Sequence, residues 1–137
     1  MDDATRSALA ITRASPAPER TVEITTIGAH SGLPRRIEIW FYRVDGTNYL
    51  SGMPGRTPDW YRNLEANPRF TLHLKHGVQA SLAVTALTIT DEAERLRVFT
   101  EIVADLNQPA NPGRIQQPTS VREWMDGSVL VEIQFDD

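Results

Sequence analysis

Short segments in which apolar and polar residues alternate constrain the fold of this chain more than any other feature. The segments cover residues 21–27, 36–44, 48–52, 70–75, 78–89 and 128–135. Successive side chains of a β-strand point to opposite faces, so this pattern predicts half-buried strands. Ile37, Ile39 and Phe41, for example, fall on one face of a strand. About six antiparallel strands are expected, and a closed or split barrel hides the edges of such a sheet best.

Turn and capping signals connect these strands. Asp45-Gly46 is a hairpin signal, so 48–52 should return antiparallel to 36–44 within a five-strand meander that one helix interrupts. That helix is expected to begin at Pro58, capped by Thr57, and to stop at 67–68. Asp91 and Glu94 have capping-box spacing and open a long helix over 91–106, and a short helix is expected around 121–125. The predicted class is mainly β (α+β): a six-or-so-stranded split β-barrel with flanking helices.

The length of 137 residues is typical of one domain. Residues 1–20, which contain Pro16 and Pro18, are expected to form a flexible N-terminal lead to a single domain over 21–137. The loop over 107–120 holds three prolines and is long enough to act as a lid.

Composition excludes several classes of function. No apolar run approaches eighteen residues, and the N-terminus resembles neither a signal nor a transit peptide, so a cytoplasmic protein without a membrane span is expected. The absence of cysteine excludes disulfides, thiolate metal sites and a cysteine nucleophile. The net charge of -4 disfavours nucleic acid as a partner. Most of the charged residues between 28 and 75 are nevertheless basic, which favours a small anionic ligand for this part of the chain.

The connection over 28–36 between two predicted strands carries the first candidate site. Its glycines allow the backbone to approach a ligand closely, and the Ser31 hydroxyl can donate a hydrogen bond. Arg35 and Arg36 can each donate paired hydrogen bonds to phosphate or carboxylate oxygens. The alternative is a polar hairpin loop with two solvated arginines.

The second candidate site runs from Ser51 into the helix that follows. Small residues leave room for a flat ring, and Trp60 or Tyr61 could stack on it. The alternative is a tight turn before a surface helix with one buried tryptophan. No metal site is predicted, because His73 and His76 would point to opposite faces.

Three motifs in order carry a family resemblance. They are Thr25-Thr26-Ile27-Gly28-x-x-Ser31-Gly32-x-Pro34-Arg35, Ser51-Gly52-x-Pro54-Gly55, and Asp59-Trp60-Tyr61-x-Asn63-Leu64-x-Ala66-Asn67-Pro68. Together they resemble the deazaflavin (F420)-dependent nitroreductase family. The resemblance implies a split barrel of the FMN-binding type, often dimeric. Such a protein transfers hydride from reduced coenzyme F420, an 8-hydroxy-5-deazaflavin, to a quinone, nitroaromatic or other electrophilic molecule.

The resemblance also implies roles for individual residues. Ser31, Gly32 and Arg35 would hold the cofactor's phosphate and acidic tail, with Arg56 adding charge. Ser51, Gly52, Trp60 and Tyr61 would border the deazaflavin ring, and Tyr61 and Ser51 are the candidate proton donors.

Two departures from the family pattern bear on the cofactor. Ala29-His30 stands where the family often has a basic pair, so either the affinity for phosphate is reduced or Arg36 supplies the contact instead; His30 and Arg36 are both counted among the expected cofactor-binding residues. The segment from Ser51 to Trp60 is one residue shorter, and Arg56 replaces a lysine. Two alternatives therefore stay open: an FMN-binding split-barrel reductase, and a non-catalytic barrel that binds a cofactor or lipid.

Overall fold

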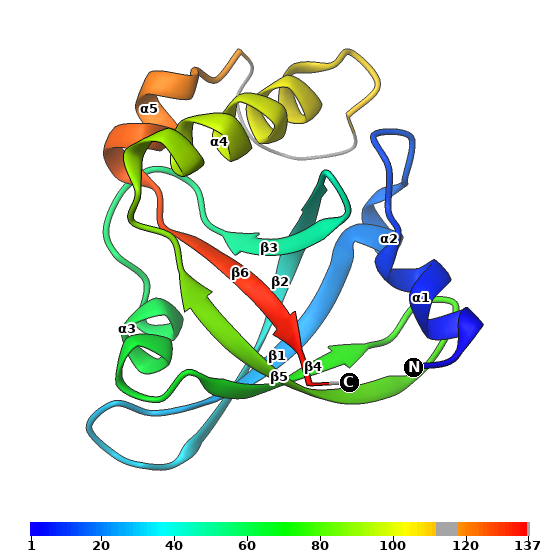
Figure 1. Cartoon of the computed structure of the whole chain (residues 1–137), viewed down its shortest axis with the longest axis vertical. Helices are drawn as coiled ribbons and strands as arrows, with labels where there is room; N and C mark the ends of the chain where they lie inside the picture. The colour runs from blue at the N-terminus through cyan, green and yellow to red at the C-terminus, as the bar shows by residue number, and fades with distance from the viewer. Residues whose placement is uncertain (112–117, 137) are drawn as a thin grey trace.

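A computed structural model describes residues 1–111 and 118–136. Six antiparallel strands close into a barrel in the order β1-β2-β3-β6-β5-β4 (Figure 1). The strands are β1 (Thr21–Ile27), β2 (Pro34–Val44), β3 (Thr47–Ser51), β4 (Arg69–Leu74), β5 (Ala80–Thr88) and β6 (Leu130–Phe135). Their ends differ from the predicted ones by at most two residues, and the mainly β barrel class is confirmed.

The strand order corrects the predicted meander. β1, β2 and β3 do follow one another, and Asp45 and Gly46 form the predicted turn, with φ angles of 50° and 80°. β3 and β4 do not pair, however: the last strand, β6, lies between β3 and β5, and β4 closes the barrel against β1. The closure pairs Ile24 with Leu72 and leaves none of the six strands as an open edge.

Five helices flank the barrel in the part of the chain described. They are α1 (Asp3–Leu9), α2 (Ala17–Arg20), α3 (Asp59–Ala66), α4 (Glu92–Asn107) and α5 (Val121–Gly127). The predicted cap of α4 is confirmed, since the Asp91 carboxylate accepts the Glu94 N–H at 3.0 Å. None of these helices is long and apolar enough to cross a membrane.

The predicted cap of α3 is wrong. Pro58 occupies the cap position in extended conformation, with φ −74° and ψ 154°, and the helix begins at Asp59 without a side-chain cap. Thr57 lies one residue too early to cap it. The Pro58 carbonyl instead accepts the first helical bonds, from the N–H groups of Tyr61 and Arg62.

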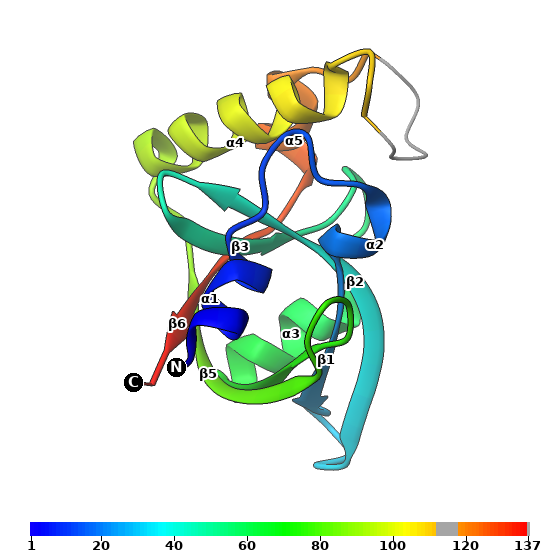
Figure 2. The same ribbon diagram turned by 90° about the vertical axis from the view of Figure 1, so that its right-hand side faces the viewer.

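Strand alternation creates two apolar cores. The barrel interior holds inward residues such as Phe41, Leu50 and Leu72. The outward face of β2 and β3 carries a second set, including Tyr42, and α4 and α5 cover it at the top of Figures 1 and 2. Trp124 of α5 is buried there, with its ring edge-on to Tyr42 at a centroid distance of 6.5 Å.

The N-terminal segment lies along one side of the barrel and faces the viewer in Figure 2. Leu9 belongs to the barrel core, and its carbonyl accepts a hydrogen bond from Asn48 Nδ2 at 2.9 Å. Arg20 is 1% exposed and forms a salt bridge with Asp105 of α4 at 2.6 Å. The division into a lead and one domain stays a prediction. The predicted lid includes residues 112–117, which lie outside the described residues.

Candidate cofactor-binding cleft

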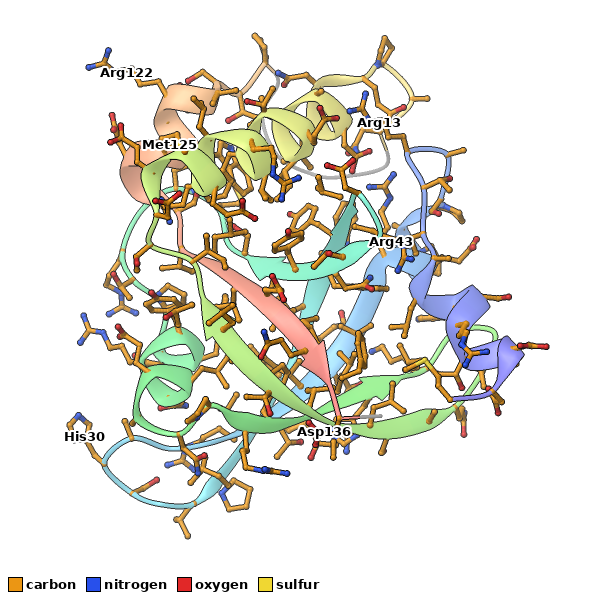
Figure 3. All side chains as sticks on the ribbon, in the orientation of Figure 1. Arg13, His30, Arg43, Arg122, Met125 and Asp136 are labelled. Atoms are coloured by element: carbon orange, nitrogen blue, oxygen red, sulfur yellow. The ribbon has the colours of Figure 1, made fainter. Side chains whose placement is uncertain are left out.

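A cleft of about 530 Å³ lies between the β1–β2 connection and α3. In Figure 1 these two segments are neighbours at the lower left, and Figure 3 shows His30 on the connection just below α3. The cleft is lined by Thr26, Gly28, Ala29, His30, Ser31, Arg35, Ile37, Asp59, Trp60, Arg62 and Asn63. Two predicted site segments thus form one concave surface.

The β1–β2 connection owes its shape to two glycines. The Gly28 N–H donates to the Leu33 carbonyl at 2.8 Å, and the Gly32 N–H donates to the Gly28 carbonyl at 2.9 Å. Gly32 has φ of 69°, a conformation that glycine adopts without the strain of a Cβ. A Cβ on Gly28 would lie 2.5 Å from Ser31 Oγ. The two glycines therefore let Ser31 fold back over the turn.

Asn63 joins the connection to α3. Its side-chain oxygen accepts the Ala29 N–H at 2.9 Å, and its Nδ2 donates to Thr26 Oγ1 at 3.1 Å. Asn63 and Thr26 are both buried. A buried amide with both groups paired is well suited to set the distance between the two walls of the cleft.

Arg35 and Arg36 face opposite sides of the sheet, because they are consecutive in β2. Arg35 lines the cleft, and its Nη2 lies 3.4 Å from Ser31 Oγ. Arg36 points to the outer face of the barrel, where its Nε donates to Glu23 at 2.6 Å. Bonds from Lys75 and then Arg36 lower the pKa of Glu23 to about 2.

The two aromatic residues of α3 occupy different places. Trp60 lines the cleft and is 9% exposed. Tyr61 is absent from the cleft lining and meets Trp60 edge-on at 6.2 Å between ring centroids. Desolvation, followed by the nearby Glu65 carboxylate, raises the pKa of the Tyr61 phenol.

The loop part of the second predicted site, residues 51–56, does not line the cleft. Ser51 is 3% exposed, and its hydroxyl donates to the Val129 carbonyl at 2.6 Å. Gly52 lies just after it, at the end of β3. Arg56 is exposed and makes no hydrogen bond or ion pair with any described residue. The loop between Gly52 and Arg56 is bonded to α5, because the Gly55 N–H donates to the Gly127 carbonyl at 3.0 Å.

Sequence reasoning gave no binding role to several residues of the cleft lining, among them three residues of α3: Asp59, Arg62 and Asn63. The signal was present, because positions i, i+3 and i+4 share one face of a helix. The adjacent face of α3, formed by Trp60 and Leu64, is the buried one. Reading the neighbouring face of α3 would have found all three.

A closed barrel of six antiparallel strands with flanking helices belongs to the split-barrel class of folds. The model of the family F420H(2)-dependent quinone reductase matches residues 6–117. The chain belongs to this family, which confirms the predicted deazaflavin-dependent oxidoreductase and coenzyme F420 as its cofactor.

Solved structures agree with the fold. A conserved hypothetical protein from Mycobacterium tuberculosis is 21% identical with a TM-score of 0.67, covering 100% of this chain and 82% of the other. An F420-H2 dependent reductase is 23% identical with a TM-score of 0.56, over 84% and 93% of the two chains. A structure described as a domain-swapped dimer is 22% identical with a TM-score of 0.57, over 88% and 81%.

Proposed function

We propose that this reductase binds reduced F420 in the cleft between the β1–β2 connection and α3 and passes hydride to a quinone, a nitroaromatic or another electrophilic small molecule. The observation that carries the proposal is the family match over residues 6–117, whose span includes every residue that lines the cleft.

The chemistry of the lining fits such a cofactor. Its phosphate and acidic tail require cationic donors, and Arg35 provides a guanidinium next to the Ser31 hydroxyl. The open turn at Gly32 allows backbone to approach an oxyanion. Arg56, exposed on the loop before α3, is proposed to meet the part of the tail that extends beyond the cleft. Gly52 and His30 are proposed to complete the binding surface.

When bound, the deazaflavin supplies the hydride. The chain's own task is to orient the ring, exclude water and assist the acceptor. Trp60 contributes an indole ring to the lining of the cleft and is proposed to border the deazaflavin ring. Ile37, 36% exposed in the same lining, offers an apolar contact for an electrophilic acceptor.

Two hydroxyls were predicted as proton donors, and their surroundings differ. The Ser51 proton is already donated to the Val129 carbonyl. The Tyr61 phenol is protonated at neutral pH, as an ordinary tyrosine is, and its hydroxyl is bonded to the Thr88 side chain. Tyr61 is only partly buried, so it stays the proposed hydrogen-bond donor to the reduced acceptor.

Fluorescence titration of the purified protein with F420 tests the proposal, with FMN titrated in parallel. We expect micromolar binding of F420 and no comparable binding of FMN. Preference for FMN would indicate an FMN-binding reductase instead. Binding of F420 without reduction of any quinone or nitroaromatic would indicate a non-catalytic barrel that binds the cofactor. Loss of Trp60 should also alter the absorbance of the bound ring; an unchanged spectrum would place Trp60 in the core alone.

We further propose a homodimer acting in the cytoplasm. The support is the domain-swapped dimer among the proteins of similar fold. Light scattering on the eluted protein should give twice the mass of 15.4 kDa, and a monomeric mass would refute the dimer.

A further inference from the structure

The basic residues that line the cleft are not the set that was predicted to bind the anion. Arg35, Arg62 and Asp59 line it, together with His30. Arg35 alone would be offset by the Asp59 carboxylate. The cleft is net cationic only because Arg62 adds a second guanidinium.

Arg36 cannot make up this charge from where it lies. It faces the outer side of the barrel and is bonded to Glu23 at 2.6 Å. Glu23 also accepts from Lys75 at 2.9 Å, so Arg36 belongs to a network of alternating charges. Bringing Arg36 to the cleft would require β2 to slip by one residue, which would move every side chain of the strand to the opposite face.

Arg62, in contrast to Arg36, lies at the cleft, and its side chain has no hydrogen-bond or ion-pair partner among the described residues. Its backbone is fixed, because Leu64 is buried in the barrel core and Asn63 is bonded to the β1–β2 connection. A rigid helix thus presents an uncommitted guanidinium to the cleft, from the wall that does not carry Arg35.

We propose that Arg62 is the second anion-binding group of this site, so that a phosphorylated ligand is held between Arg35 of β2 and Arg62 of α3. The ligand chemistry is a phosphate with its attached acidic tail. Guanidinium groups suit it because their planar N–H donors pair with two oxyanion oxygens at once. This inference rests on the proposed function and identifies which basic residue replaces the missing pair at Ala29-His30.

Affinity measured for two related ligands tests the proposal. One ligand is F420, and the other is the deazaflavin riboside that lacks the phosphate and acidic tail. Arg62→Ala should weaken F420 binding by roughly tenfold to a hundredfold, the range expected for a lost charge-assisted hydrogen bond. Binding of the riboside should change by less than about twofold, because the ring does not depend on this contact.

Arg36→Ala is the matched control, since it removes the same group from an adjacent strand position that faces away from the cleft. It should leave the affinity for both ligands within about twofold of the wild-type value. Arg62→Lys should restore part of the lost F420 affinity, because it keeps the charge but not the planar fork. Circular dichroism establishes that each variant is folded.

The outcomes separate this inference from the proposed function. If the wild-type protein binds neither ligand, the proposed function fails and the inference fails with it. If the wild type binds F420 and Arg62→Ala binds it equally well, only the role of Arg62 is overturned. Equal weakening for both ligands would also overturn it, because Arg62 would then act through the ring or the fold.

Discussion

Asn63 shows how one residue can determine the shape of the cleft. Its two hydrogen bonds join α3 to the end of β1 and to the connection that follows. The family motif contained this residue, but spacing alone assigned it no role, because its partners lie 34 and 37 positions away. Contacts at such separations are decided by the pairing of elements rather than by local pattern.

We expect Asn63→Ala to lower the free energy of unfolding by about 1–3 kcal/mol, because it leaves the Ala29 N–H and the Thr26 hydroxyl without partners. Urea unfolding measures the loss. Affinity for F420 should also fall, since the walls of the cleft are no longer tied together. Thr26→Val is the comparison, because it removes one of the two bonds and leaves the Ala29 bond intact. Unchanged stability and affinity in Asn63→Ala would contradict the assigned role.

Arg35 and Arg36 could have been distinguished from the sequence. The predicted strand began at residue 36, so Arg35 was placed in the connection and Arg36 at the start of the strand, and both were given the same anion-binding role. β2 in fact begins at Pro34, a position that proline tolerates because the first residue of a strand can lack a ladder bond. Extending the alternation back by two residues places the arginines on opposite faces.

At the scale of elements, ion pairs on the outer face of the barrel join β1, β2 and the residue that follows β4. Glu23 of β1 accepts from Arg36 of β2 at 2.6 Å and from Lys75, which follows β4, at 2.9 Å. Lys75 also pairs with Glu38 of β2. The cluster spans the β1–β4 junction that closes the barrel.

This cluster predicts a dependence of stability on pH. The pKa of Glu23 is lowered from 4.5 to about 2 in the folded protein. Its contribution is therefore present above pH 4.5 and is lost as the pH falls from 4.5 towards 2. Urea unfolding between pH 6 and pH 2.5 should show a steeper loss for the wild type than for Glu23→Gln. If the free energy of unfolding of the two proteins fell equally with pH, the Glu23 carboxylate would not be stabilised by Lys75 and Arg36.

At the scale of the whole molecule, the buried guanidinium of Arg20 joins the N-terminal segment to α4. Arg20 donates to both carboxylate oxygens of Asp105 and to the carbonyls of Ser15, Thr12 and Arg13. The residues of this network come from the start of the chain and from α4. Arg20 also lies 5.6 Å from the ring of Trp40 in β2.

We expect Arg20→Met to lower the free energy of unfolding by about 3–5 kcal/mol, because it leaves the Asp105 carboxylate and several carbonyls without their donor. Arg122→Met serves as the control, since the Arg122 side chain is 90% exposed in its salt bridge with Asp126. That change should stay within about 0.5 kcal/mol of the wild type. Equal stability of the two variants would show that the Arg20 network does not anchor the N-terminal segment.

Local physics let the sequence determine the strands and the α4 cap, and the class of cofactor followed from the family resemblance of three short motifs. Strand alternation has a period of two and a capping box spans four residues, so both can be read within short windows. Only the tertiary structure decided that β6 lies between β3 and β5, that Arg62 joins Arg35 in the cleft, and that Arg20 is buried against Asp105. Each of these depends on groups far apart in the chain, whose contact is set by closure of the whole barrel.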